Sequence, residues 1–165
     1  MTAQSPETRS TPALSVAVAR DDPRDPGATA LLRASHALME SLFPPEENFH
    51  LDIDALCAPD IRFFTARAAG SVLGTGALAI RDGYGEVKSM FVDEAARGRG
   101  VAEAILRRIE DEARTLALPC LRLETGISLH AALRLYRRHG FEHCRAFGDY
   151  PDSASSIFME KPLAP

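Results

Sequence analysis

The chain has 165 residues, of which 45% are hydrophobic and 25% are charged, a composition typical of one globular domain with its own core. The formal net charge of -4, from 19 Lys and Arg against 23 Asp and Glu, leaves no basic excess for binding nucleic acid or an anionic membrane. No run of about eighteen uncharged apolar residues occurs, and the N-terminus lacks the apolar core of a secretion signal, so we expect a cytoplasmic protein.

The first part of the chain predicts a tail, a strand and a helix. Residues 1–13 are rich in Thr, Ser and Pro without apolar periodicity, so we expect a disordered tail followed by a single domain over 14–165. Apolar residues alternate with small ones in 14–20, which predicts a strand. Apolar residues recur at helical spacing in 28–42, and the Pro-Pro pair that follows ends this predicted helix.

The middle of the chain predicts antiparallel strands. Residues 46–60 are irregular and have room for one short helix. The segments 61–68 and 72–80 are rich in apolar and β-branched residues and are separated by Ala-Gly-Ser, which indicates a hairpin. A second tight turn at 82–85 leads into a strand over 86–92. These strands are expected to lie side by side.

The last part of the chain predicts two further helices. At helical spacing, residues 99–117 place apolar side chains on one face and charged side chains on the opposite face, which indicates an amphipathic helix. A short strand at 120–123, a helix over 128–139 closed by Gly140, and a last strand at 156–160 follow. The predicted fold class is therefore α/β, with a mixed, mostly antiparallel central sheet flanked by helices.

The turn at residues 97–102, here called the phosphate turn, connects a strand to the amphipathic helix. The first N–H groups of a helix have no internal acceptor and carry a partial positive charge, so they bind phosphate well. Gly98 and Gly100 allow phosphate oxygens to approach the backbone, and Arg97 and Arg99 can add charge, although either arginine is alternatively a solvated residue. A dinucleotide fingerprint and a P-loop are both excluded, because Glu103 replaces a required small residue and Gly-Lys-Ser/Thr is absent.

Two motifs carry a resemblance to a known family. Arg97, Gly100 and Ala102 match the pattern Arg or Gln, two residues, Gly, one residue, Gly or Ala. The element Leu-Tyr-x-x-x-Gly-Phe around Tyr136 follows downstream. With both motifs in this order, the chain resembles the GNAT superfamily of N-acetyltransferases over residues 61–161.

The resemblance implies that acetyl-CoA is the cosubstrate. In proteins that this chain resembles, the strand before the turn separates from its neighbour, and its free backbone groups bind the pantetheine arm and polarise the thioester carbonyl. The matching positions are Met90, Phe91 and Val92. The coenzyme diphosphate is expected at Arg97, Gly98, Arg99, Gly100, Val101 and Ala102.

The resemblance also suggests which side chains act on the reacting groups. Tyr136 is the expected general acid for the thiolate, with packing of the helix on the sheet as the alternative. Glu86 is the expected general base, and an ordinary surface glutamate is the alternative. Glu124 ends a neighbouring strand and is expected to bind the substrate ammonium or to act as the base itself.

Three further observations limit these expectations. Many relatives carry Asn seven residues before the tyrosine, where this chain has Leu129, so no side-chain amide is expected to hold the coenzyme there. The loop 147–152 either borders the acceptor pocket or is an ordinary surface loop. No metal site is expected, because the histidines are scattered and Gly140 ends the helix between His139 and His143.

The predicted function is transfer of acetyl from acetyl-CoA to a primary amine of a small molecule or peptide by direct attack in a ternary complex. One alternative is a non-catalytic acyl-CoA-binding sensor or assembly module, in which Tyr136 and Glu86 would be dispensable. Another is an enzyme of the same fold with a longer acyl donor or an acceptor other than an amine. No nucleic-acid or membrane partner is expected, and a homodimer is consistent with the family.

Overall fold

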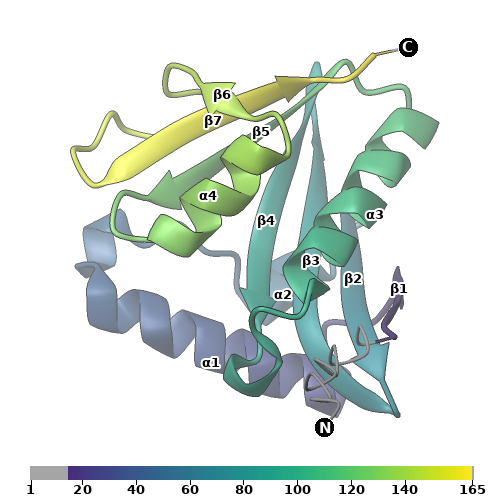
Figure 1. The fold of residues 1–165 in the computed structure, drawn as a ribbon. Helices are drawn as coiled ribbons and strands as arrows, with labels where there is room; N and C mark the ends of the chain where they lie inside the picture. The colour runs from purple at the N-terminus through teal and green to yellow at the C-terminus, as the bar shows by residue number, and fades with distance from the viewer. Residues whose placement is uncertain (1–14, 165) are drawn as a thin grey trace, which may run out of the picture.

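The computed structural model describes residues 15–164, which form one seven-stranded sheet with helices on both faces (Figure 1). The elements in chain order are β1 (Ala17–Arg20), α1 (Pro26–Leu42), the 3-10 turn η1 (Pro45–Glu47), α2 (Ile53–Leu56), β2 (Ile61–Ala68), β3 (Ser71–Arg81), β4 (Tyr84–Val92), the 3-10 turn η2 (Glu94–Ala96), α3 (Val101–Thr115), β5 (Cys120–Gly126), α4 (His130–Arg138), β6 (Glu142–His143) and β7 (Ser156–Pro162). The predicted tail at 1–13 and the first residue of the predicted strand 14–20 lie outside the described residues.

The strand order in the sheet is β1-β2-β3-β4-β5-β7-β6. Only β4 and β5 pair in parallel, and every other neighbouring pair is antiparallel. The prediction of a mixed, mostly antiparallel sheet is therefore confirmed. The edge strand β6 was not predicted, because a strand of two residues is too short to show alternation.

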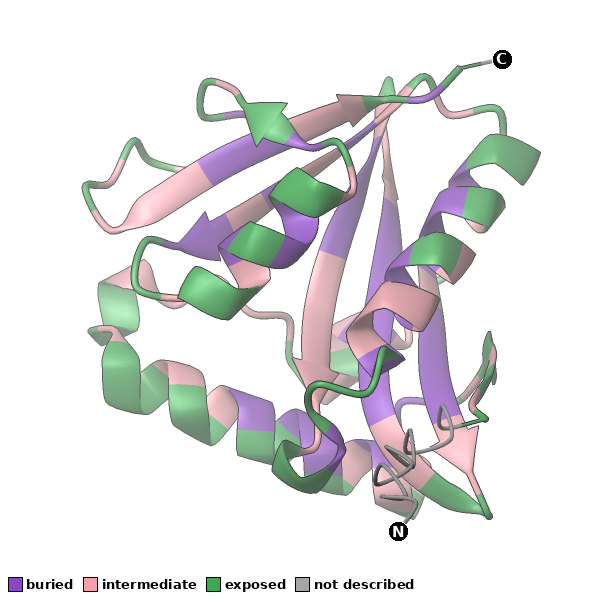
Figure 2. Ribbon diagram, viewed as in Figure 1, coloured by how far each residue is buried: buried purple, intermediate pink, exposed green. Residues whose placement is uncertain are grey.

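The central strands bury both faces, and successive side chains face different helices. Phe63 and Ala77 pack in a cluster with α1 and α2, whereas Phe64 and Leu78 pack in the larger cluster with α3 and α4. This follows from the two-residue period of a strand. Figure 2 shows the buried residues concentrated on the central strands and on the inner sides of the helices.

The helix predicted at 28–42 begins two residues earlier than expected, at Pro26. Asp25 caps it, because its carboxylate accepts a hydrogen bond from the N–H of Ala28 at 3.1 Å, and proline suits the first position of a helix. The helix passes β4 and extends toward α4, and Leu42 at its end is 47% exposed (Figure 1). In residues 15–164 no helix combines the length and apolar character needed to cross a bilayer.

The helix α3 begins two residues later than the predicted span 99–117, because Gly100 has a left-handed backbone with a φ of 82°, and it ends at Thr115. It packs unusually close to β3. A Cβ atom at Gly76 would lie 2.4 Å from a side-chain carbon of Ile105, which is much closer than van der Waals contact. Glycine on β3 therefore lets α3, and with it the phosphate turn, sit directly against the middle of the sheet.

Candidate active site

The parallel strands β4 and β5 are paired over only a short part of their length. Their ladder joins Gly85 to Leu121 and Glu86 to Arg122, although β4 continues to Val92 and β5 to Gly126. Beyond the ladder the two strands separate, so backbone groups on this side of β4 are not used by β5 (Figure 1). The separation provides a place where a ligand can add hydrogen bonds in the sheet.

A β-bulge interrupts β4 on its other side. The pairing with β3 shifts so that Ser89 and Met90 together oppose Gly76. Ser89 has a φ of 56°, and the hydroxyl of Thr75 donates a hydrogen bond to the Ser89 carbonyl at 2.8 Å, which holds the bulge. The bulge cancels the usual alternation, so Lys88, Ser89 and Met90 all line the same cavity.

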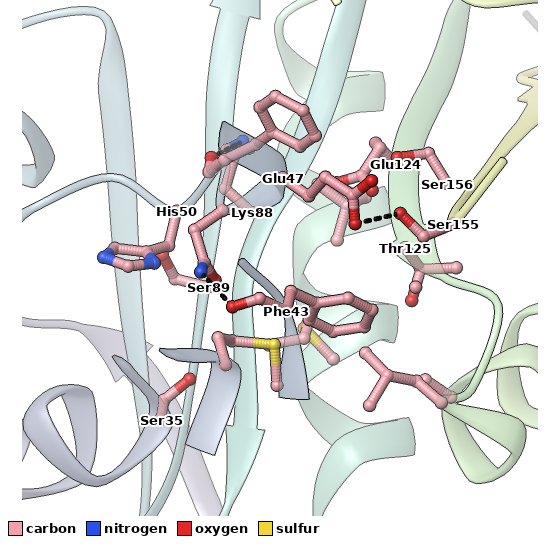
Figure 3. Close-up of a pocket in the computed structure, with 18 of the residues that line it drawn as sticks. Ser35, Phe43, Glu47, His50, Lys88, Ser89, Glu124, Thr125, Ser155 and Ser156 are labelled. Atoms are coloured by element: carbon pink, nitrogen blue, oxygen red, sulfur yellow. Dashed lines mark hydrogen bonds between the residues drawn. The ribbon is translucent and has the colours of Figure 1, made fainter. Parts of the chain in front are cut away.

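This cavity, of about 140 Å³, lies between the separated strands (Figure 3). Residues 87–90 of β4 and 124–126 of β5 form two of its walls. Phe43 and residues 47–50, which follow α1, close a third side, and Tyr136 contributes from α4. The lining therefore brings together segments from the N-terminal, central and C-terminal parts of the chain.

Glu124 is a half-buried acid that lines this cavity and has no salt-bridge partner within the described part of the chain. Among residues 15–164 no Lys, Arg or His forms a salt bridge with its carboxylate, although fourteen such pairs occur elsewhere. Burial raises the pKa of Glu124, against the opposing effects of a hydrogen bond from Ser156 and the positive charge of Lys88. A carboxylate in this state attracts a cation and is a stronger base than an exposed glutamate.

Tyr136 packs in the core and also borders the cavity. Its ring packs edge-to-face on Phe141 with a centroid separation of 5.7 Å, and only 6% of the residue is exposed, so it does hold α4 on the sheet. It also lines the cavity. Burial, and to a smaller extent the charge of Glu124, raises the pKa of Tyr136, so the phenol stays protonated at neutral pH.

Glu86 is only 3% exposed, so its interpretation as an ordinary surface glutamate is wrong. The hydroxyl of Tyr150 donates a hydrogen bond to its carboxylate, and Arg81 and Lys88 each lie 3.5 Å from it. Glu86 is not part of the cavity lining.

Lys88 lines the cavity and connects β4 to Phe49 and to Tyr150. Its Nζ donates to the Tyr150 hydroxyl at 2.6 Å and to the Phe49 carbonyl at 2.9 Å. Burial lowers the pKa of Lys88, and the neighbouring Glu86 opposes this effect. The loop 147–152 is thus attached to the site through Tyr150, and it is not a free surface loop.

The phosphate turn has the backbone form that an anion site needs. Gly98 and Gly100 have φ values of 74° and 82°, and no side chain caps the start of α3, so the first N–H groups of the helix lack a side-chain acceptor. A Cβ at either glycine would meet no atom within 4 Å, which leaves open space for phosphate oxygens. Arg97 and Arg99 are exposed, and the Arg97 guanidinium lies 5.7 Å from the centre of the Phe91 ring.

The comparisons with known proteins agree with this geometry. The model of the acetyltransferase (GNAT) family matches residues 29–141. The chain belongs to the GNAT family. It is 45% identical over 150 residues to a protein of Azospirillum brasilense named IAA acetyltransferase, with 90% of this chain and 98% of that protein covered.

Two solved structures extend the comparison. A protein of Klebsiella pneumoniae described as an acyl-CoA N-acyltransferase has a TM-score of 0.76 and 33% identity, over 90% of this chain and 98% of that one. A GNAT acetyltransferase of Elizabethkingia anophelis, described with acetyl-CoA bound, has a TM-score of 0.68 and 17% identity, over 90% and 98% of the two chains. This GNAT chain is therefore an acetyl-CoA-dependent N-acetyltransferase, which disfavours the non-catalytic alternative.

Sequence reasoning missed several residues of the cavity in this GNAT protein. Phe43, His50 and Ser155 come from segments without a motif, and only the tertiary structure brings them to β4 and β5. Lys88 could have been predicted from the sequence, because a lysine inside an otherwise apolar central strand indicates a buried charge.

Proposed function

We propose that this enzyme acetylates a primary amine of a small molecule or peptide by direct attack on acetyl-CoA in the cavity between β4 and β5. The observation that carries this proposal is the half-buried carboxylate of Glu124, which forms no salt bridge within residues 15–164 and shares a cavity with Tyr136. The cavity lies where β4 and β5 separate, so the thioester and the amine can meet there.

The phosphate turn binds the coenzyme diphosphate in this proposal. The N–H groups at the start of α3 donate to its oxygens, and Arg97 and Arg99 add positive charge, with Gly98, Gly100, Val101 and Ala102 supplying backbone. The pantetheine arm pairs with backbone groups of Met90, Phe91 and Val92 that β5 leaves free. The thioester then reaches the cavity, where backbone N–H groups polarise its carbonyl.

Glu124 receives the amine. The substrate enters as an ammonium ion and pairs with the carboxylate, which forms no salt bridge in the part of the chain that the structure describes. Because the pKa of Glu124 is raised, it takes one proton from the ammonium more readily than an exposed glutamate would. The neutral nitrogen attacks the thioester carbonyl carbon and forms a tetrahedral intermediate.

Tyr136 assists the departure of the thiolate. As the intermediate collapses, the C–S bond breaks, the nitrogen loses its second proton to solvent, and the amide product forms. The phenol donates a hydrogen bond to the sulfur and delivers a proton to it, and the phenolate is reprotonated from solvent. One ammonium ion and one acetyl-CoA thus give one amide, one coenzyme A thiol and one released proton.

Glu86 remains a second candidate for the base. Its carboxylate does not line the cavity, but the Tyr150 hydroxyl connects it to Lys88, which does. Replacing each glutamate by glutamine separates the two possibilities. The base is the residue whose loss removes the acid limb of the pH–rate profile.

The test is release of coenzyme A thiol from acetyl-CoA across a panel of amines, with wild type and Tyr136→Phe measured in parallel. The panel includes amino acids, polyamines, aminoglycosides and peptides, together with IAA, because the A. brasilense relative is named for it. Amine-dependent release that falls in the variant supports the proposal. Tight binding of acetyl-CoA without amine-dependent release would overturn it.

A further inference from the structure

The cavity between β4 and β5 has acidic side chains on one side and hydrogen-bond donors on the opposite side. Figure 3 shows Glu124 and Glu47 on the side of β5 and β7, and His50, Lys88 and Ser89 on the opposite side. Glu47 accepts a hydrogen bond from the Ser155 hydroxyl at 2.7 Å, whereas Glu124 has no basic partner in residues 15–164. The cavity thus offers acid groups to one end of a ligand and hydrogen-bond donors to the other.

Two polar atoms on the donor side have no partner in the described residues. They are the Oγ of Ser89 and the Nδ1 of His50, and both are buried. Buried polar atoms in native proteins are nearly always hydrogen-bonded, and these two belong to residues that line one cavity, so each is open to a further hydrogen-bond partner. A hydroxyl and an imidazole N–H are both suitable donors to an oxyanion.

Both orphaned atoms are held in place by neighbouring structure. The bulge on β4 fixes Ser89, as Thr75 donates a hydrogen bond to its carbonyl. The ring of His50 stacks on that of His36 with centroids 4.1 Å apart and planes 16° apart. Ser89 is thus fixed by a strand, whereas His50, in the irregular segment between η1 and α2, is held by its ring stacking.

Lys88 contributes positive charge on the same wall. Its Nζ already donates to the Phe49 carbonyl and the Tyr150 hydroxyl, so it acts on an anion through its field and not through a free N–H. Glu86, at 3.5 Å, offsets part of that charge, and Arg81 lies at the same distance from Glu86. Direct contact with an anion is therefore assigned to Ser89 and His50.

We propose that the acceptor is an aminocarboxylate, an amino acid or a close analogue, whose ammonium pairs with Glu124 and whose carboxylate accepts hydrogen bonds from Ser89 Oγ and His50 Nδ1. This inference rests on the proposed function and names its substrate class. The volume of about 140 Å³ fits a small molecule, since a cavity of about 150 Å³ holds benzene.

The test compares acceptors that differ only in the carboxylate. Thiol release is measured with the twenty standard L-amino acids, and the best acceptor is then compared with its primary amide and with its decarboxylated amine. We expect kcat/KM for the amino acid to exceed that for both analogues at least tenfold. Equal or better use of either analogue, or acetylation of other amines but of none of the amino acids, would overturn the inference.

Variants locate the carboxylate contact. Ser89→Ala and His50→Phe are each expected to lower kcat/KM for the amino acid about tenfold more than kcat/KM for its decarboxylated amine. Ser128→Ala, at an exposed position outside the cavity lining, is the matched control. An equal loss with both acceptors would exclude these residues as the carboxylate site.

The outcomes separate this inference from the proposed function. If amines without a carboxylate are acetylated preferentially, the N-acetyltransferase mechanism at Glu124 and Tyr136 stands and the aminocarboxylate inference falls. If acetyl-CoA binds but no amine of any class is acetylated, both fall. The comparison of acceptors uses only the wild-type protein, so it decides the question even if a variant fails to fold.

Discussion

The substitution Glu124→Gln tests the centre of the site most directly. It removes the unpaired charge from the cavity, keeps the shape of the side chain and keeps an oxygen for the hydrogen bond from Ser156. A general base contributes about 10²–10⁴-fold to a reaction rate, which corresponds to roughly 2.7–5.4 kcal/mol of transition-state free energy. We therefore expect kcat to fall by this factor, and KM for the amine to rise because the ammonium loses its partner.

The pH dependence follows from the raised pKa of Glu124. The deprotonated carboxylate is the active form, so wild-type kcat/KM rises as the pH increases through the pKa of Glu124. The acid limb should lie above the usual carboxyl range of about pH 4. In Glu124→Gln this limb should be absent. Initial rates of thiol release between pH 5 and pH 9 measure both profiles.

The stability of the same variant should change in the opposite direction from its activity. A carboxyl whose pKa is higher in the folded state favours folding when it is protonated. That contribution is fully present below the unfolded pKa and is lost as the pH rises through the folded pKa. At pH 8, Glu124→Gln should therefore melt at a higher temperature than wild type, and the difference should shrink toward about pH 4.

Thermal melts at the two pH values, with Glu86→Gln as the control, complete the test. Glu86 has a hydrogen bond from Tyr150 and two basic neighbours, so its neutralisation should lower the melting temperature. Full activity together with a lowered melting temperature in Glu124→Gln would refute the reasoning, because it would show a carboxylate that is stabilising and not functional.

Three other predictions concern the turn, the acid and the packing of the fold. Gly100→Leu should abolish binding of acetyl-CoA, measured by calorimetry, because the side chain would fill the space at the start of α3. Gly83→Leu is the matched control and should leave binding intact. The two glycines have φ values of 82° and 81°, and neither has an atom within 4 Å of its Cβ position, so the backbone strain is the same in both variants. Tyr136→Phe should lower kcat by roughly 10²-fold with an unchanged Kd for acetyl-CoA, and unchanged turnover would remove its assigned role. Gly76→Ala should destabilise the fold by about 1–3 kcal/mol in chemical denaturation, because its Cβ would lie 2.4 Å from Ile105; wild-type stability would contradict the close packing of α3 on β3.

Elements with strong local signals were predicted well from the sequence. The hairpin strands at 61–68 and 72–80 correspond to β2 and β3, and the amphipathic helix corresponds to α3. Errors at the ends of elements have identifiable causes. The cap at Asp25 extended α1, and the left-handed Gly100 delayed the start of α3.

The sequence by itself determined the fold class, the family and the location of the phosphate turn. These depend on backbone form and on residues that are neighbours in the chain, because two glycines and a helix start follow one another within a few residues of the turn. Periodicity likewise reveals strands and helices, since each element must bury one face.

Only the tertiary structure decided which side chains share the cavity. Glu124, Ser89 and His50 lie in separate segments, and they meet because β4 and β5 separate and α1 carries residues 43–50 across the opening. Burial, and with it the pKa of Glu124 and the missing partners of Ser89 and His50, depends on neighbours that are distant in sequence. No local sequence pattern predicts contacts between residues that are distant in the chain. The set of side chains that share this cavity could therefore be identified only in the folded structure.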